Sequence, residues 1–279
     1  MIGVVHLVWA PLGPQPLRAF LRSFTAYPAG AQHELVILLN GATGVDPRAL
    51  RERDALLAEL VGIEHRLISL ERPVLDLQAY GEAARVLEHE HLCFVNSYCT
   101  ILAEGWLAHL AGALARPGVA LVGPSGSWES QAEWRRGRVR HWPQQLLALP
   151  RARREYPRFP NPHLRTSAFM LERERLRSFG LAHLPDKRST YLLESGRASI
   201  TRRLHEQGLR AVVVGRDGSV YDVDAWPASH TFRSGEQENL LIADNQTSDY
   251  QHASLRLRRR LSRGTWGPRG TILPSSGRQ

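Results

Sequence analysis

The chain has 279 residues, 43% of them hydrophobic and 23% charged, and this composition excludes a disordered or fibrous protein. Its two cysteines, Cys93 and Cys99, exclude a disulfide framework and a four-cysteine zinc site. The net charge is +9, and Lys187 is the only lysine among 36 basic residues. Because arginine binds phosphate groups through two parallel hydrogen bonds, this charge favours a nucleotide, a nucleic acid or an anionic membrane as partner, without choosing between them.

The sequence shows neither a membrane-spanning stretch nor a signal peptide. No stretch approaches the roughly 20 apolar residues that a membrane-spanning helix needs. The N-terminus lacks the basic start, apolar stretch and small-residue cleavage site of a signal peptide. We therefore expect a cytoplasmic protein.

Short apolar runs alternate with helical patterns through the first part of the chain. Strands are predicted at residues 3–9, 35–39, 66–70, 92–95 and 119–122. Helices are predicted at residues 17–24, 47–60, 80–87 and 101–115. Strands that are separated by helices indicate an α/β fold, in which a mostly parallel sheet has helices on both faces.

The later part of the chain changes character. A basic segment at residues 135–140 and a proline-rich stretch at 156–162 predict a surface excursion. A strand that returns to the sheet is predicted at 166–171, and a helix at 195–207 that precedes a short strand at 211–214.

The C-terminal region is basic. No acidic residue follows Asp249, and the glycines, prolines and serines from Gly264 on predict disorder. We expect one domain over residues 1–248, followed by a basic helix and a flexible tail over residues 249–279.

Polar residues follow two of the predicted strands. In sheets of this class, ligands bind beyond the carboxyl ends of the strands. Asn96, Ser97 and Tyr98 follow the fourth strand and are candidate ligand contacts, although Ser97 could instead cap a helix that begins near Ile101. Asn40 precedes a glycine and either makes a turn or contacts a base or ribose.

Two later segments could also carry chemistry. Trp128 stands beside Glu129, which suits an exposed ring that stacks on a sugar or base, but tryptophan is also a common core residue. Glu194 could be a general base if an acceptor hydroxyl lies within hydrogen-bond reach. The alternative is an acid near the N-terminus of the following helix, where the helix dipole favours it.

Several common catalytic motifs are absent from the sequence. It contains no phosphate-binding P-loop, no G-x-S-x-G nucleophile elbow and no H-E-x-x-H zinc motif. Asp222 and Asp224 form a D-x-D triplet, but it lies near the 211–214 strand rather than after the fourth strand.

Four segments together resemble a bacterial glycosyltransferase of the GT-A fold and family 2 type, over residues 3 to about 232. The segment 33–41 resembles the second strand unit, and 92–98, followed by Gly105 and Trp106, resembles the central strand, motif and helix. Asp76, Tyr80 and Gly81 with residues 83–85 resemble the segment that lines the nucleotide, and residues 194–208 the segment that bears the catalytic base.

The resemblance implies a three-layer α/β/α GT-A fold and an inverting hexosyltransferase that acts in cell-surface polysaccharide biosynthesis. It would move a sugar from a nucleotide-sugar donor to a glycan or lipid-linked acceptor, with Glu194 as base. It further implies a set of donor-binding residues (Ala10, Asn40, Asp76, Tyr80, Arg85, Asn96 and Ser97) and of acceptor-binding residues (Trp128, Glu129 and Arg197).

The chain departs from the family at the metal motif. Family members usually place D-x-D after the fourth strand, whereas this chain has Asn96, Ser97 and Tyr98. Amide and hydroxyl groups alone hold Mg²⁺ or Mn²⁺ poorly, because hard cations favour carboxylates. No metal ligand is certain, and His230 falls where some members place a late one. Either arginines such as Arg233 neutralise the diphosphate, or the donor holds a metal with little protein help, or no sugar is transferred.

Other function classes remain open at this stage. A non-catalytic protein that binds a nucleotide-sugar or glycan is the alternative, which the missing carboxylates favour. Nucleic-acid binding rests on charge alone, since no zinc finger, helix-turn-helix or aromatic RNA-binding motif is present, and we do not expect it. The basic segment 255–263 could lie on an anionic membrane at its inner face, or be a solvated helix.

Overall fold

The computed structural model describes residues 1–132 and 150–270. Its centre is an eight-stranded sheet with the strand order β11-β10-β6-β9-β4-β1-β2-β3. Strands β9 and β11 run opposite to the other six, so the sheet is mostly parallel as predicted. The strands are β1 (Ile2–Trp9), β2 (His33–Asn40), β3 (Arg66–Ser69), β4 (His91–Val95), β6 (Val119–Gly123), β9 (Ala168–Glu172), β10 (Arg210–Val214) and β11 (Val220–Tyr221).

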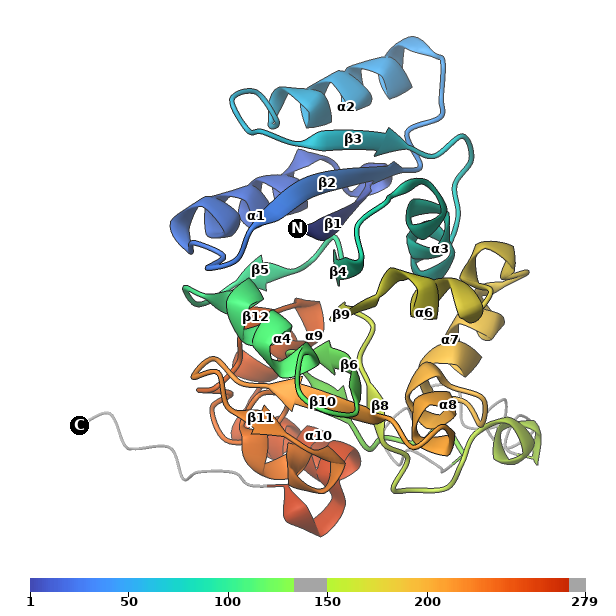
Figure 1. The fold of residues 1–279 in the computed structure, drawn as a ribbon, viewed down its shortest axis with the longest axis vertical. Helices are drawn as coiled ribbons and strands as arrows, with labels where there is room; N and C mark the ends of the chain where they lie inside the picture. The colour runs from blue at the N-terminus through green and yellow to red at the C-terminus, as the bar shows by residue number, and fades with distance from the viewer. Residues whose placement is uncertain (133–149, 271–279) are drawn as a thin grey trace.

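Helices cover both faces of the sheet, which confirms the predicted three-layer α/β architecture (Figure 1). One face packs against α1 (Pro14–Ala26), α2 (Pro47–Ala58) and α4 (Trp106–Leu114). The other face packs against α3 (Asp76–Val86), α6 (Arg173–Ser178), α7 (Lys187–Ser195) and α8 (Ile200–Glu206). Alternate residues of β1 supply the two cores: Val5 and Leu7 point to one, Val4 and Val8 to the other.

Short elements complete the chain. They are η1 (Ala10–Leu12), η3 (Leu181–His183), η4 (Val223–Ser229), η5 (Gly267–Arg269), α9 (Asn245–Gln251), α10 (Leu255–Trp266) and two small sheets, β5 (Thr100–Ile101) with β12 (Ile242–Ala243) and β7 (Gly126–Ser127) with β8 (His163–Leu164). Because β12 pairs with β5, the late residue Asp244 follows directly beside the loop after β4.

Two predicted helices differ in the structure. Residues 100 and 101 form strand β5, and α4 begins only after Gly105, which has the left-handed conformation. Ser97 therefore caps no helix at Ile101. Of the helix predicted at 195–207, residues 200–206 form α8, whereas Ser195 is the last residue of the preceding helix α7. Ser199 caps α8 by accepting from the Arg202 amide at 3.4 Å. Glu194 consequently lies in the last turn of α7, not at a helix N-terminus.

The C-terminal helix packs on the domain. The predicted boundary at residue 248 falls inside α9. Trp266 of α10 is buried, donates through Nε1 to the Phe232 carbonyl at 2.7 Å and meets Trp128 edge-on. Residues 264–266, which the composition marks as disordered, are thus helical, because one large aromatic ring anchors them. No helix in the described residues is long and apolar enough to cross a membrane.

The basic segment 135–140, predicted as part of a surface excursion, lies outside the described residues. Strand β9 confirms the predicted return to the sheet, since it inserts between β4 and β6 in the opposite direction. The residues just before β9 therefore reach the carboxyl edge of β4, where the candidate ligand contacts lie.

Candidate active site

Strand order reverses between β1 and β4, and the crevice at such a point is where open α/β sheets bind ligands. Ser97 joins the two strand ends there. Its hydroxyl donates to the Leu7 carbonyl at 2.7 Å and accepts from the Trp9 amide at 3.0 Å. Ala10 follows in η1 and is buried. The hydroxyl of Ser97 thus continues the β1–β4 pairing by one step, and it is buried rather than presented to a ligand.

Asn96 and Tyr98 shape the rest of this loop. The backbone N–H of Asn96 donates to the Ser167 carbonyl at 2.8 Å, and the side-chain Oδ1 of Asn96 accepts from the backbone N–H of Tyr98 at 3.2 Å. The Tyr98 ring is 46% exposed. The loop after β4 is therefore held by the segment before β9, and it offers an amide nitrogen and an aromatic face.

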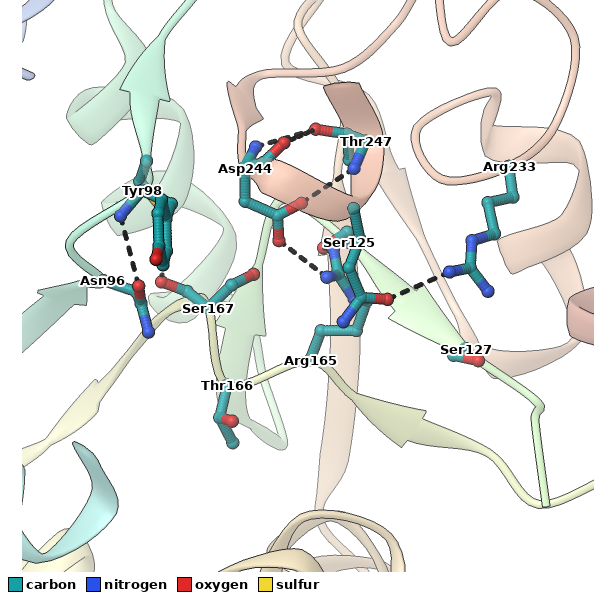
Figure 2. A network of polar contacts seen from close by, with 12 residues as sticks. Asn96, Tyr98, Ser125, Ser127, Arg165, Thr166, Ser167, Arg233, Asp244 and Thr247 are labelled. Atoms are coloured by element: carbon teal, nitrogen blue, oxygen red, sulfur yellow. Dashed lines mark hydrogen bonds and ion pairs between the residues drawn. The ribbon is translucent and has the colours of Figure 1, made fainter. Parts of the chain in front are cut away.

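The segment Arg165–Thr166–Ser167 connects the polar groups of the site (Figure 2). Side chains alternate along an extended segment. Arg165 and Ser167 point to Asp244, with 2.6 Å between Arg165 Nη2 and Asp244 Oδ2. Thr166 between them bonds instead to Glu194. Three successive residues thus link the loop after β4, the C-terminal part of the chain and α7.

Asp244 and Arg165 form a buried ion pair, with side chains 3% and 7% exposed. Asp244 also caps α9 by accepting from the Thr247 amide at 2.9 Å. Burial acts to raise the pKa of Asp244, but the Arg165 charge and the bonds from Thr247 and Ser167 outweigh it and hold this pKa below its ordinary value. The carboxylate therefore stays ionised and keeps the guanidinium in place.

Glu194 is half-buried, and its Oε1 accepts two hydrogen bonds from Thr166, from the amide at 3.1 Å and from the hydroxyl at 2.9 Å. Its Oε2 has no hydrogen-bond partner among the described residues. A carboxylate in the last turn of a helix opposes the helix dipole, which costs about 0.3–1 kcal/mol. Thr166 thus fixes one oxygen of the carboxylate, while the other has no hydrogen-bond partner among the described residues.

Two titratable groups lie near Glu194. Burial raises the pKa of Asp76, the amide of Leu77 opposes this, and the Glu194 carboxylate raises it further. Burial lowers the pKa of His163, while the carboxylates of Glu194 and Glu129 act in the opposite direction. The His163 Nδ1 lies 2.8 Å from the Asn161 carbonyl, which favours a proton on Nδ1 and leaves Nε2 as the acceptor.

Asn40 is used within the fold. Its side chain is 1% exposed, and it exchanges two hydrogen bonds with the backbone of Val74: Nδ2 donates to the carbonyl at 2.8 Å and Oδ1 accepts from the amide at 3.1 Å. It therefore holds the loop before α3 rather than presenting its amide to a base. Arg72 and Val74 of that loop line a pocket of about 410 Å³, together with Gln78 and His183.

Tyr80 and Arg85 do not join the site. Tyr80 is fully buried between Phe94 and Phe169, whose ring centres lie 4.6 and 5.7 Å from the centre of the Tyr80 ring. Arg85 is exposed near the other end of α3, about 13 Å along the helix from Asp76 at 1.5 Å per residue, and it pairs with Glu82 at 3.0 Å. Helical spacing thus turns Tyr80 into the core and carries Arg85 away from the loop after β4, and the donor contacts at both residues stay predictions.

The predicted acceptor residues are dispersed. Trp128 is 6% exposed and donates through Nε1 to the Val223 carbonyl at 3.2 Å, so the prediction of an exposed stacking ring is wrong. Glu129 is half-buried and pairs with Arg233 at 3.1 Å. Arg197 is exposed, and its guanidinium donates to the carbonyls of Arg153 and Arg154.

The described residues do not fit a divalent metal ion. They contain no group of three histidine, cysteine or carboxylate side chains that could hold one. Asp244 is the carboxylate beside the loop after β4, and Arg165 occupies it. His230 Nδ1 lies 2.5 Å from Glu238, and Asp222 pairs with Arg210, which begins β10 at the amino edge of the sheet.

Sequence reasoning missed Arg165, Thr166, Ser167 and Asp244. Two signals were present in the sequence. Three polar residues stand directly before the apolar strand 168–172, at the edge where ligands bind. Asp244 and Thr247 have the spacing of a helix N-cap, which marks a helix start after residue 244. Only the pairing of β12 with β5 brings this carboxylate to β4.

Comparison with solved structures finds similar folds at low identity. The mannosyltransferase PcManGT of Pyrobaculum calidifontis, in complex with GDP-Man and Mn²⁺, is 17% identical over 82% of this chain, with a TM-score of 0.44. Glucosyl-3-phosphoglycerate synthase of Mycobacterium tuberculosis, with Mn²⁺, UDP and phosphoglyceric acid, is 20% identical over 63%, with a TM-score of 0.37. The chain spans 59% and 56% of these two proteins.

A third similar structure is 4-diphosphocytidyl-2C-methyl-D-erythritol synthase of Anaerococcus prevotii, which is 9% identical over 77% of this chain and 88% of its own, with a TM-score of 0.46. No family model and no curated protein matches the chain. Since all three TM-scores are below 0.5, the strand order and the residues of the site must carry any functional argument.

Proposed function

We propose that this protein is a glycosyltransferase of the GT-A type, which moves a sugar with inversion from a nucleotide-sugar donor to a glycan or lipid-linked acceptor. The observation that carries the proposal is the linkage of Glu194, through Thr166, to the loop after β4 at the reversal of strand order. A half-buried carboxylate with one fixed and one open oxygen suits a general base at such a crevice.

The proposed reaction is an in-line displacement. Glu194 Oε2 takes the proton of an acceptor hydroxyl, whose oxygen forms a bond to the anomeric carbon. The bond from that carbon to the diphosphate oxygen breaks, and its electron pair leaves with the nucleoside diphosphate. Thr166 keeps the carboxylate oriented through Oε1. Asp76, whose pKa is raised chiefly by burial, lies close enough to Glu194 to sense its charge, and we assign it to the donor side.

The residues at the crevice divide between two substrates in this proposal. Asn96 and Tyr98 face the donor, and the loop that Asn40 holds, with Arg72 and Val74, supplies the nucleoside side. Glu129 remains a candidate acceptor contact. The residues do not fit Mn²⁺ or Mg²⁺, so we derive no step through a metal ion.

The alternative is a protein that binds a nucleotide-sugar or glycan without transferring it. The absence of carboxylates at residues 96–98 favours it. The open oxygen of Glu194 favours transfer. Release of free sugar or of a glycosylated acceptor separates the two functions.

The proposal is tested by calorimetric titration with UDP-, GDP-, dTDP- and CMP-sugars, each with EDTA and with Mn²⁺. We expect one donor to bind in EDTA, because the described site offers a guanidinium and no metal ligand set. Binding that requires Mn²⁺ would show that the site recruits a metal after all. Failure of every donor to bind under both conditions would contradict a nucleotide-sugar function.

We also propose that the protein associates with the inner face of a membrane through α10. Four arginines of this helix are exposed: Arg256, Arg259, Arg260 and Arg263. Their spacing of i, i+3, i+4 and i+7 places them in one stripe along the helix. None of the four has an ion-pair partner among the described residues. Each basic residue near an anionic leaflet contributes about 1 kcal/mol.

Changing these four arginines to glutamine is expected to weaken binding to phosphatidylglycerol-containing vesicles by at least about 100-fold, as measured by vesicle sedimentation. The control variant loses the same charge at four exposed arginines elsewhere on the protein. These are Arg22 in α1, Arg51 and Arg53 in α2, and Arg116 after α4. Equal binding by the two variants would refute a specific role of α10.

A further inference from the structure

We propose that Arg165 is the cation that binds the donor diphosphate, in place of a metal ion. This inference rests on the proposed function and names the group that meets the leaving group of that reaction. Arg165 lies directly before Thr166, which holds Glu194, and it shares Asp244 with Ser167, whose carbonyl holds the loop after β4. It lies beside Thr166 and Ser167, within reach of Asp244 (Figure 2).

The surroundings of Arg165 orient its charge. Nη2 pairs with Asp244, Nη1 donates to the Ser125 hydroxyl at 3.2 Å, and the guanidinium lies 4.0 Å above the centre of the Phe232 ring. These contacts leave it little rotational freedom. A guanidinium has five N–H groups, and these two contacts use two of them. We assign the others to the oxygens of the donor diphosphate.

The charge balance matches the chemistry that a metal would supply. A divalent cation between two carboxylates is neutral as a unit, yet its positive side binds a diphosphate. The pair of one guanidinium and one carboxylate is likewise neutral, with its positive end fixed by the partner. A fixed dipole of this kind stabilises charge that develops on a leaving group without reorganisation. Arginine also matches phosphate oxygens in a bidentate geometry.

Asp244 explains why the guanidinium stays in place. Its pKa is held below the ordinary value despite burial, through Arg165, Thr247 and Ser167. An uncompensated arginine at this depth would cost several kcal/mol. A metal ion at the same carboxylate would have to displace Arg165 and lie beside its positive charge. The donor set of the site thus disfavours a metal and favours the guanidinium.

The test compares nucleoside diphosphate with nucleoside monophosphate, using UDP with UMP and GDP with GMP, by calorimetry in EDTA. For the unaltered chain we expect the diphosphate to bind about 10- to 100-fold more tightly than the monophosphate, the range for hydrogen bonds to a charged group. Arg165→Gln should reduce this ratio to near one, while the monophosphate affinity changes little.

A second variant and a control keep the result interpretable if Arg165→Gln unfolds. Arg165→Lys retains the charge without the planar fork, and we expect it to keep part of the ratio. Arg173→Gln removes a partly buried arginine directly after the carboxyl end of β9, which donates to the Leu87 carbonyl, and should leave the ratio unchanged. Circular dichroism reports whether each variant is folded.

The outcomes distinguish this inference from the proposed function. A diphosphate that binds only with Mn²⁺ leaves the transferase proposal standing and overturns the role of Arg165. Binding in EDTA with an undiminished ratio in folded Arg165→Gln, or in folded Arg165→Lys, overturns it as well. If no nucleotide binds with or without Mn²⁺, the proposed function itself fails, and the inference falls with it.

Discussion

Replacement of Glu194 by glutamine is expected to lower turnover by about 10²–10⁴, the contribution typical of a positioned general base. The substitution is conservative in this structure, because the amide oxygen can still accept both hydrogen bonds from Thr166 at the position of Oε1. The amide nitrogen then replaces Oε2 and cannot take a proton from the acceptor. We expect kcat to fall while the KM for the donor stays close to that of the unaltered chain.

The measurement is the initial rate of sugar transfer with the donor that calorimetry identifies. Glu206→Gln is the matched control, since Glu206 is an exposed acid on the neighbouring helix α8. It should leave turnover unchanged. A Glu194→Gln protein that is folded and turns over within about twofold of the unaltered chain would remove Glu194 from the mechanism.

Acid is expected to destabilise the fold through His6. This histidine of β1 is fully buried and stacks on Phe20, with ring centres 3.7 Å apart. Burial lowers the pKa of His6 from 6.5 to about 3, against a smaller opposing effect of the Val95 backbone. The unfolded chain therefore binds a proton at His6 below pH 6.5, whereas the folded chain does so only near pH 3, so stability decreases as the pH falls through this window.

Proton linkage gives the expected loss in the free energy of unfolding. Between pH 7 and pH 5, the free energy of unfolding should fall by about 2 kcal/mol through His6, and by about 4 kcal/mol by pH 3. Urea unfolding of the native chain and of His6→Leu at these pH values measures it, because leucine has no proton to bind.

His252→Leu is the matched control, since it makes the same exchange at an exposed histidine. Other carboxyl groups and histidines contribute equally to all three proteins, so the difference between them isolates His6. Equal pH dependence in native and His6→Leu protein would show that His6 is not held neutral in the fold.

The local pattern of the sequence predicted most elements of the sheet but little of the site. Apolar runs marked the strands, because a strand buried on both faces excludes polar side chains over its whole length. The helix at residue 47 was equally clear, since Asp46 accepts from the amides of Arg48 and Ala49 and a proline begins the helix. These features depend on neighbours in the chain.

Predictions that depended on distant partners failed more often. Trp128 was predicted as an exposed ring, but Trp266, 138 positions later in the chain, covers it. Tyr80 faces Phe169 because β9 inserts beside β4. The exposure of a large ring is set by which remote element packs against it, and no local pattern encodes that choice.

Residue type and short-range spacing were enough to predict the α/β class, most strands and helices, and the missing carboxylates after β4, while Glu194 as base stays a prediction. The links from Glu194 to Asp244 through Arg165, Thr166 and Ser167 depend instead on the packed fold. Asp244 lies 79 positions after Arg165, and the pairing of β12 with β5 brings them together. A buried ion pair of this kind forms only where the fold excludes water around both partners, and burial is a property of the whole packed chain.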